Sequence, residues 1–411
     1  MMTYNSSKEW THVNRPHLLA SSAFLFLIAS NYMLQSVRET IASGMTISGP
    51  VLVGSSALAS LLVATLMTSD ATTLYSENIK VYLLIQIWGV GIGCAIFLTW
   101  SDFTGALFFI TSSVATMLCA SFLWGLMNSR ELNLKGYFHE FSLAANIGQV
   151  LGSGMSYFVT VAIDEIINRN RVLLLLSSIF CTISAQCVWN LRTIEKNLPI
   201  KEVQIKQISN KSQSVYLENP LLVTGIAALQ ILSCFAASLL YLDKLDIIQN
   251  LGVRDSISLG AGLNLTIACV IVIIQISGIG KALPSNVSLL LLPILTSISL
   301  VSTALYSNES SLNSTYWLIF LNRVLSYAVS KPTREGLYGS LSEADRIKSK
   351  PMVDSIACKL GTAAASPFYS ITKGNLLPTS GILLLWILVT HRVSSMSKNV
   401  DENIEMKEKP E

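Results

Sequence analysis

Charge is scarce in this sequence, and its scarcity excludes most classes of soluble protein. Charged residues make up 13% of the 411 residues, against roughly 25% in a typical soluble domain. Apolar residues account for 51%, and the mean hydropathy is +0.53. A chain this poor in charge and this rich in apolar residues is typical of a protein that spans a membrane several times.

Metal-binding and catalytic patterns are also missing. The sequence has only four histidines, and none of its seven cysteines belongs to a CxxC or Cys/His ligand spacing. We interpret the cysteines as small packing residues, because all of them lie within apolar stretches. They are Cys94, Cys119, Cys181, Cys187, Cys234, Cys269 and Cys358. Without nucleophile–base or metal-ligand spacing, we expect no enzyme, no bound metal and no cofactor.

What the sequence does have is apolar stretches long enough to cross a bilayer, which takes about 20 residues in a helix. There are twelve: 17–37, 49–69, 81–100, 104–127, 138–163, 172–191, 220–242, 257–277, 286–306, 315–333, 352–371 and 380–397. A large soluble helical protein is the alternative, but its helices should show polar faces, and 81–100 and 286–306 show almost none. The sequence therefore predicts an all-α polytopic membrane protein with about 12 transmembrane helices.

The charges between the stretches predict the topology. With the N-terminus inside, most Lys and Arg residues fall in inner loops, as the positive-inside rule requires. The outer loops would carry only Arg169, Arg171, Lys244, Arg254 and Lys373, besides any part of the Arg38 turn that emerges. Both termini are therefore predicted to be cytoplasmic.

The longest hydrophilic interruption separates six stretches from six, the 6+6 layout of major-facilitator transporters. The predicted units are a cytoplasmic segment 1–16, a six-helix half 17–191, a cytoplasmic linker 192–219, a second half 220–397 and a disordered charged tail 398–411. In that layout, the first and fourth helices of each half line a central cavity.

Two Arg-Glu pairs end apolar stretches in opposite halves, Arg38-Glu39 after 17–37 and Arg334-Glu335 after 315–333. A charge within a bilayer persists mainly where it faces water, a partner or a substrate. We expect these pairs, on the first and tenth stretches, to face one aqueous cavity from both walls.

Further cations lie beside a helix-breaking residue. Pro332 should kink or end the tenth span, and Lys331, Arg334 and Glu335 cluster at that break. Such cations can hold a phosphate or carboxylate. They can equally reach out to the inner interface as part of a basic hinge, and the sequence leaves both interpretations open.

Small residues recur every four positions in the fifth stretch, at Gly148, Gly152 and Ser156. This spacing lets a neighbouring helix approach closely. The pattern indicates tight packing, and a smooth face of this kind could also slide during a conformational change.

Several segments together resemble the bacterial and plastid ATP/ADP translocase family of nucleotide transporters. They are Val37-Arg38-Glu39-Thr40, the end of the fourth stretch from Trp124 to Asn128, Ala145 to Gly152, and Trp317 to Gly361, which includes Lys359. The resemblance implies a major-facilitator fold. It also implies a substrate site drawn from Arg38, Glu39, Asn128, Lys331, Arg334, Glu335 and Lys359.

The sequence departs from the family where charge matters. A lysine important for transport is replaced by Ile41, an acidic residue of the fourth span by Ser112, and the acidic residue of the seventh span has no match in 236–240. Arg334 replaces a lysine and keeps the charge. The chain therefore resembles distant members of the family more than established nucleotide exchangers.

Three functions are compatible with these observations. The first is a secondary transporter of nucleotides, of the ATP/ADP exchange type, or of a related phosphorylated metabolite, working by alternating access. The second is a transporter of another small organic anion or a proton-coupled solute, with Glu39 and Glu335 as candidate proton carriers. The third is a non-transporting membrane scaffold or receptor.

The expected partners are a small anionic substrate and the lipid bilayer, with no nucleic acid. We expect the protein to function as a monomer in a plasma membrane or an organelle envelope.

Overall fold

The structure of the protein is a computed structural model. It describes residues 15–69, 78–127, 137–197, 219–250, 253–278, 285–306, 312–338, 341, 349, 353–372 and 376–408.

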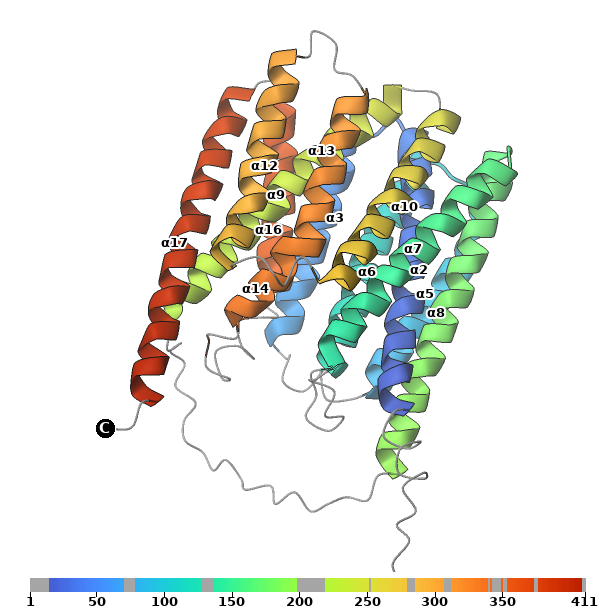
Figure 1. The fold of residues 1–411 in the computed structure, drawn as a ribbon. Helices are drawn as coiled ribbons and strands as arrows, with labels where there is room; N and C mark the ends of the chain where they lie inside the picture. Colours follow the sequence, from blue (N-terminus) through green and yellow to red (C-terminus); the bar gives the residue numbers. More distant parts are fainter. Residues whose placement is uncertain are drawn as a thin grey trace, which may run out of the picture.

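Each of the twelve predicted stretches is helical, and the described residues contain no strand (Figure 1). The first six helices are α2 (Arg15–Ser43), α3 (Gly49–Ser69), α5 (Asn78–Ala95), α6 (Asp102–Met127), α7 (Phe138–Ala162) and α8 (Ile166–Asn197). The second set begins with α9 (Pro220–Asn250), α10 (Val253–Ser277), α12 (Ser285–Tyr306) and α13 (Leu312–Leu325). It ends with α16 (Cys358–Thr372) and α17 (Leu376–Glu408). This arrangement confirms the predicted all-α fold.

Apolar length supports a membrane location. Among the described residues, seven helices are long and apolar enough to cross a bilayer. Two further apolar helices, Ile79–Ala95 and Val287–Ile298, are shorter. Large apolar side chains such as Phe97 and Ile371 are more than 80% exposed, as lipid-facing residues would be.

The tenth and eleventh spans contain π-helical turns. The π turn Ser326–Ser330 joins α13 to α14 (Lys331–Leu337), and the π turn Val353–Ala357 precedes α16. Pro332, which has no N–H to donate, lies two residues after the first of these. The helix therefore continues past the proline by widening one turn, an adjustment often found at functional sites.

Helix ends differ from prediction at several points: α5 ends at Ala95, before the predicted 100, while α9 and α17 extend furthest past the ends of their stretches. The seventh span was expected to end at 242, before Asp243 and Lys244, but α9 continues to Asn250. The tail from 398 was expected to be disordered, but α17 continues to Glu408. In both cases charged residues extend a helix that the apolar span has already nucleated, and each added residue then costs little.

Two helix pairs pack backbone to backbone, one in each half. A Cβ on Gly148 or Gly152 of α7 would lie 2.3 Å from the carbonyl oxygen of Leu25 or Ala29 on α2, and Ser156 on the same face is fully buried. A Cβ on Gly361 of α16 would lie 2.2 Å from the carbonyl oxygen of Ile231 on α9. The small residues at these positions are what permit the close approach.

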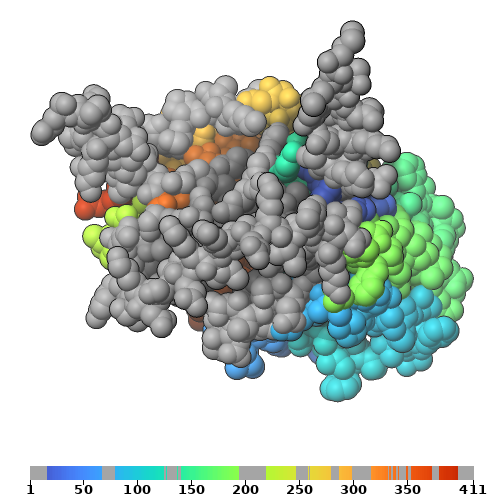
Figure 2. Space-filling model, turned by 90° about the horizontal axis from the view of Figure 1, so that it is seen from below, coloured from blue at the N-terminus to red at the C-terminus, as the bar shows by residue number. Residues whose placement is uncertain are grey.

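The two six-helix halves lie side by side. Figure 2 shows the N-terminal half, in blue to green, and the C-terminal half, in yellow to red, on opposite sides of the molecule. They meet at α7 with α10, where Asn146 Nδ2 donates to Gln275 Oε1 at 2.7 Å. They also meet at α3 with α16, where the Ser366 hydroxyl donates to the Pro50 carbonyl. Helices α2 and α9 also contact each other across the two halves.

Candidate functional site

A buried ion pair joins the two halves. Lys244 Nζ on α9 lies 2.8 Å from both carboxylate oxygens of Glu39 on α2, and the two side chains are 2% and 4% exposed. Gln35, one turn before Glu39, donates from Nε2 to Glu39 Oε1 at 2.9 Å. Charged residues buried in a membrane protein pair with each other in this way and usually mark a functional site.

A third helix covers this ion pair. A Cβ on Gly260 of α10 would lie 3.4 Å from both Glu39 Oε2 and Lys244 Nζ, which is ordinary van der Waals contact. The α10 backbone therefore lies against the charges, which are almost fully buried. The low dielectric that results strengthens the attraction between the two charges.

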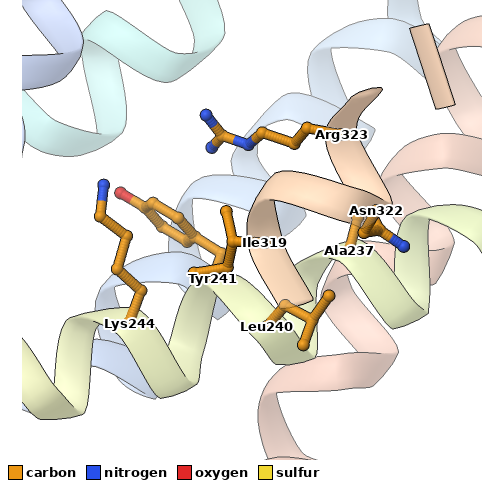
Figure 3. A pocket seen from close by; sticks show the side chains of 7 residues that line it. All are labelled: Ala237, Leu240, Tyr241, Lys244, Ile319, Asn322 and Arg323. Atoms are coloured by element: carbon orange, nitrogen blue, oxygen red, sulfur yellow. The ribbon is translucent and has the colours of Figure 1, made fainter. Parts of the chain in front are cut away.

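A small cavity of about 20 Å³ adjoins the ion pair (Figure 3). Its lining residues come from α9 and α13: Ala237, Leu240, Tyr241, Lys244, Ile319, Asn322 and Arg323. Figure 3 shows the Lys244 ammonium, the Tyr241 hydroxyl and the Arg323 guanidinium directed into the same space. An apolar wall with a few convergent polar groups is the usual form of a small-molecule site.

Arg323 gives this cavity an excess positive charge. Its Nη1 donates to Asn264 Oδ1 on α10 at 2.6 Å, a neutral partner. No carboxylate among the described residues forms an ion pair with Arg323, although its charge does interact with Glu39 and Lys244. Since one carboxylate faces two cations, the cavity favours an anionic ligand.

Of the predicted site residues, Arg38 directly precedes Glu39 in sequence. It forms a hydrogen bond within the N-terminal half. Its Nη1 donates to the Ser113 hydroxyl on α6 at 2.8 Å, and its guanidinium lies 5.7 Å from the centre of the Phe109 ring. The charge of Lys359 on α16, in the opposite half, interacts with that of Arg38. A cation of one half therefore lies within electrostatic range of a cation of the other.

Arg334 forms its polar contacts within the C-terminal half. It donates to Gln230 Oε1 on α9, and its Nη2 lies 3.8 Å from Asp354 Oδ1. Lys331 lies 5.6 Å from the centre of the Tyr327 ring. Because Arg38 and Arg334 each have partners in their own half, a shared cavity for these two arginines stays a prediction.

Two predicted site residues lie wholly or partly outside the described part of the chain. Asn128 is outside the described residues, and of Glu335 only the backbone, within α14, is described.

The expected positions of two basic residues were wrong. Lys244 and Arg169 were both assigned to outer loops, but their side chains are 2% and 1% exposed. Each lies in a helix that extends beyond the apolar window used to predict it, Lys244 in α9 and Arg169 in α8. Hydropathy marks where lipid contact ends, and it does not mark where a helix ends.

Three residues of the site were not predicted from the sequence: Lys244, Arg323 and Tyr241. A signal for Arg323 was present, since it is a charge in the interior of the stretch 315–333. Lys244 followed the predicted end of its span, and its partner Glu39 is 205 residues away.

Searches by sequence return no match, either to a protein-family model or to a curated protein. Solved structures do match. A D-xylose–proton symporter shares 12% identity at a TM-score of 0.62, with 93% of this chain and 96% of that chain covered. A bacterial homologue of the iron transporter ferroportin, in an outward-facing state, shares 14% identity at a TM-score of 0.62, with 93% of this chain and 100% of that chain covered. The human organic anion transporter MFSD10 shares 11% identity at a TM-score of 0.60, with 92% of this chain and 99% of that chain covered.

These likenesses extend over nearly the whole length of each chain and cover both halves. At such low identity they show the fold and not the substrate. The fold implied by the resemblance to nucleotide translocases is confirmed, whereas membership of that family stays a prediction. The chain is an integral, multi-pass membrane protein with the major-facilitator fold.

Proposed function

We propose that this protein is a secondary transporter that moves a small organic anion across the membrane by alternating access. The observation that carries the proposal is the cavity beside the Glu39–Lys244 pair, where Lys244 and Arg323 present two cations against one carboxylate. The fold supports it, since two halves around a midplane site are the framework of alternating access.

The ion pair supplies a coupling between ligand and conformation. It links α2 to α9, so the halves separate at this point only if Lys244 and Glu39 part. Leaving either charge buried and unpaired is costly, whereas an anion in the cavity would give Lys244 a new partner. A bound anion therefore lowers the barrier to separation, because it binds the separated state better than the paired one.

The cavity is small in this conformation. About 20 Å³ is room for roughly one water molecule, so a ligand requires the cavity to widen as the halves move apart. A short carboxylate or a small phosphorylated metabolite requires less widening than a nucleotide. Nucleotides remain in the test because of the sequence motifs, and the organic anion transporter among the structural neighbours favours a small anion.

Proton coupling is a second candidate, favoured by the burial of Glu39. Protonation of this carboxylate would remove the charge that holds Lys244 and so release the link between the halves. A D-xylose–proton symporter is among the structural neighbours. The two functions are compatible if a proton and an anion enter together.

A ligand panel tests the proposal on the purified protein. We expect short carboxylates or sugar phosphates to raise the melting temperature, while neutral sugars of similar size leave it unchanged. A ligand at 100 times its Kd stabilises by about 2.7 kcal/mol, which a thermal-shift assay resolves. Stabilisation by neutral sugars alone would contradict an anion site, and stabilisation by nucleotides alone would favour the exchanger predicted from the motifs.

A further inference from the structure

Two thiols meet where α9 packs on α16. Cys234 Sγ and Cys358 Sγ lie 2.7 Å apart although 124 residues separate them in sequence. Both cysteines are free and partly exposed. Gly361, one turn after Cys358, lies against the α9 backbone and holds the two helices at this separation.

This thiol pair belongs to a chain of polar contacts that ends at Arg334. Gln230 donates from Nε2 to Cys234 Sγ at 3.3 Å, and its Oε1 accepts a hydrogen bond from Arg334. Arg334 in turn lies 3.8 Å from Asp354. A change at Cys234 therefore reaches Arg334 through one side chain, Gln230.

The charges near the pair are positive on balance. The charges of Lys359 and Arg334 both interact with the two thiols, and the Asp354 carboxylate interacts with Cys358. Two cations against one carboxylate favour the approach of an anionic reagent. By contrast Cys119 and Cys181, which also lie near each other, are fully buried.

We propose that Cys234 and Cys358 are a redox modification site that forms a reversible disulfide and thereby changes how Gln230 holds Arg334. The oxidant is a small anionic disulfide of the glutathione type. The thiolate of one cysteine attacks this disulfide, giving a mixed disulfide and one glutathione thiolate.

The second cysteine then attacks the mixed disulfide and releases the second glutathione. Two protein thiols are oxidised, one glutathione disulfide is reduced to two thiols, and the cysteine protons pass to the glutathione that leaves. The sulfur separation shortens from 2.7 Å to about 2.0 Å.

Disulfide formation is tested on the full chain in lipid nanodiscs, equilibrated with glutathione disulfide and then alkylated and digested. We expect a peptide pair linked through Cys234 and Cys358, reversed by reduced glutathione, while Cys119 and Cys181 stay reduced. Cys358→Ser should instead leave a glutathione adduct on Cys234. Recovery of both thiols unmodified from the wild-type chain, or of two separate adducts, would overturn the proposal.

The effect of oxidation on Arg334 is measured separately, by the rate at which phenylglyoxal modifies its side chain. Weakening one hydrogen bond in the chain of contacts should raise the rate by roughly two- to tenfold on oxidation. The double variant Cys234→Ser/Cys358→Ser should show no dependence on glutathione. An unchanged rate in the oxidised wild type would refute the connection to Arg334, and neither measurement depends on the protein being a transporter.

Discussion

Replacing Glu39 with glutamine should lower the free energy of unfolding by about 3–5 kcal/mol, because Lys244 is then left buried without a counter-charge. Lys244→Met should cost a similar amount by stranding the Glu39 carboxylate. The double variant Glu39→Gln/Lys244→Met should recover most of the loss, since neither charge remains and Gln35 still finds an amide oxygen at position 39. Thermal and denaturant unfolding in detergent measures all three.

Arg171→Met is the matched control for this cycle. It removes a cation from the exposed start of α8, and a change within about 0.5 kcal/mol is expected. If the double variant is as unstable as the sum of the single variants, Glu39 and Lys244 do not act as a pair. Stability restored without activity would separate the structural role of the ion pair from its role in transport.

Removing the Arg323 guanidinium should weaken anion binding by roughly ten- to a hundredfold, the usual cost of a lost charge-assisted hydrogen bond. The affinity is measured by titrating Arg323→Ala with the best anion of the ligand panel. Arg323→Lys should lie between the wild type and the alanine variant, because it keeps the charge but not the planar fork.

Two comparisons make the Arg323 result specific. Arg392→Ala removes an exposed cation from α17 and should leave the affinity unchanged. Asn264→Ala removes the partner that positions Arg323 and should weaken anion binding less than Arg323→Ala does. Equal losses in the Arg323 and Arg392 variants would mean that general charge, and not this cavity, attracts the anion.

The fold was predictable from the sequence because a bilayer imposes strong local constraints. Twelve apolar stretches must be helical, since every backbone polar group in lipid has to be satisfied within its own segment. Pro332 likewise marked the irregular turn in the tenth span before the π turn was seen. Both signals depend only on residues that are near in sequence.

The site was predictable only in part, because it depends on contacts between distant residues. Glu39 was identified from its own charge in an apolar stretch, but its partner Lys244 could not be, since a lysine after an apolar run looks like a loop residue. Arg323 was missed for another reason. The Arg-Glu pairs at 38–39 and 334–335 drew attention to the ends of spans, whereas the less tolerable charge lay inside one.

Counterflow in proteoliposomes tests whether the protein transports an anion. Vesicles that contain the wild-type protein are loaded with the anion that stabilises it most, and a trace of the labelled anion is then added outside. We expect transient accumulation of label by the wild type and by Arg171→Met, and little or none by Arg323→Ala or Glu39→Gln/Lys244→Met. Binding of the anion without any accumulation in the wild type would contradict transport and favour a scaffold or receptor.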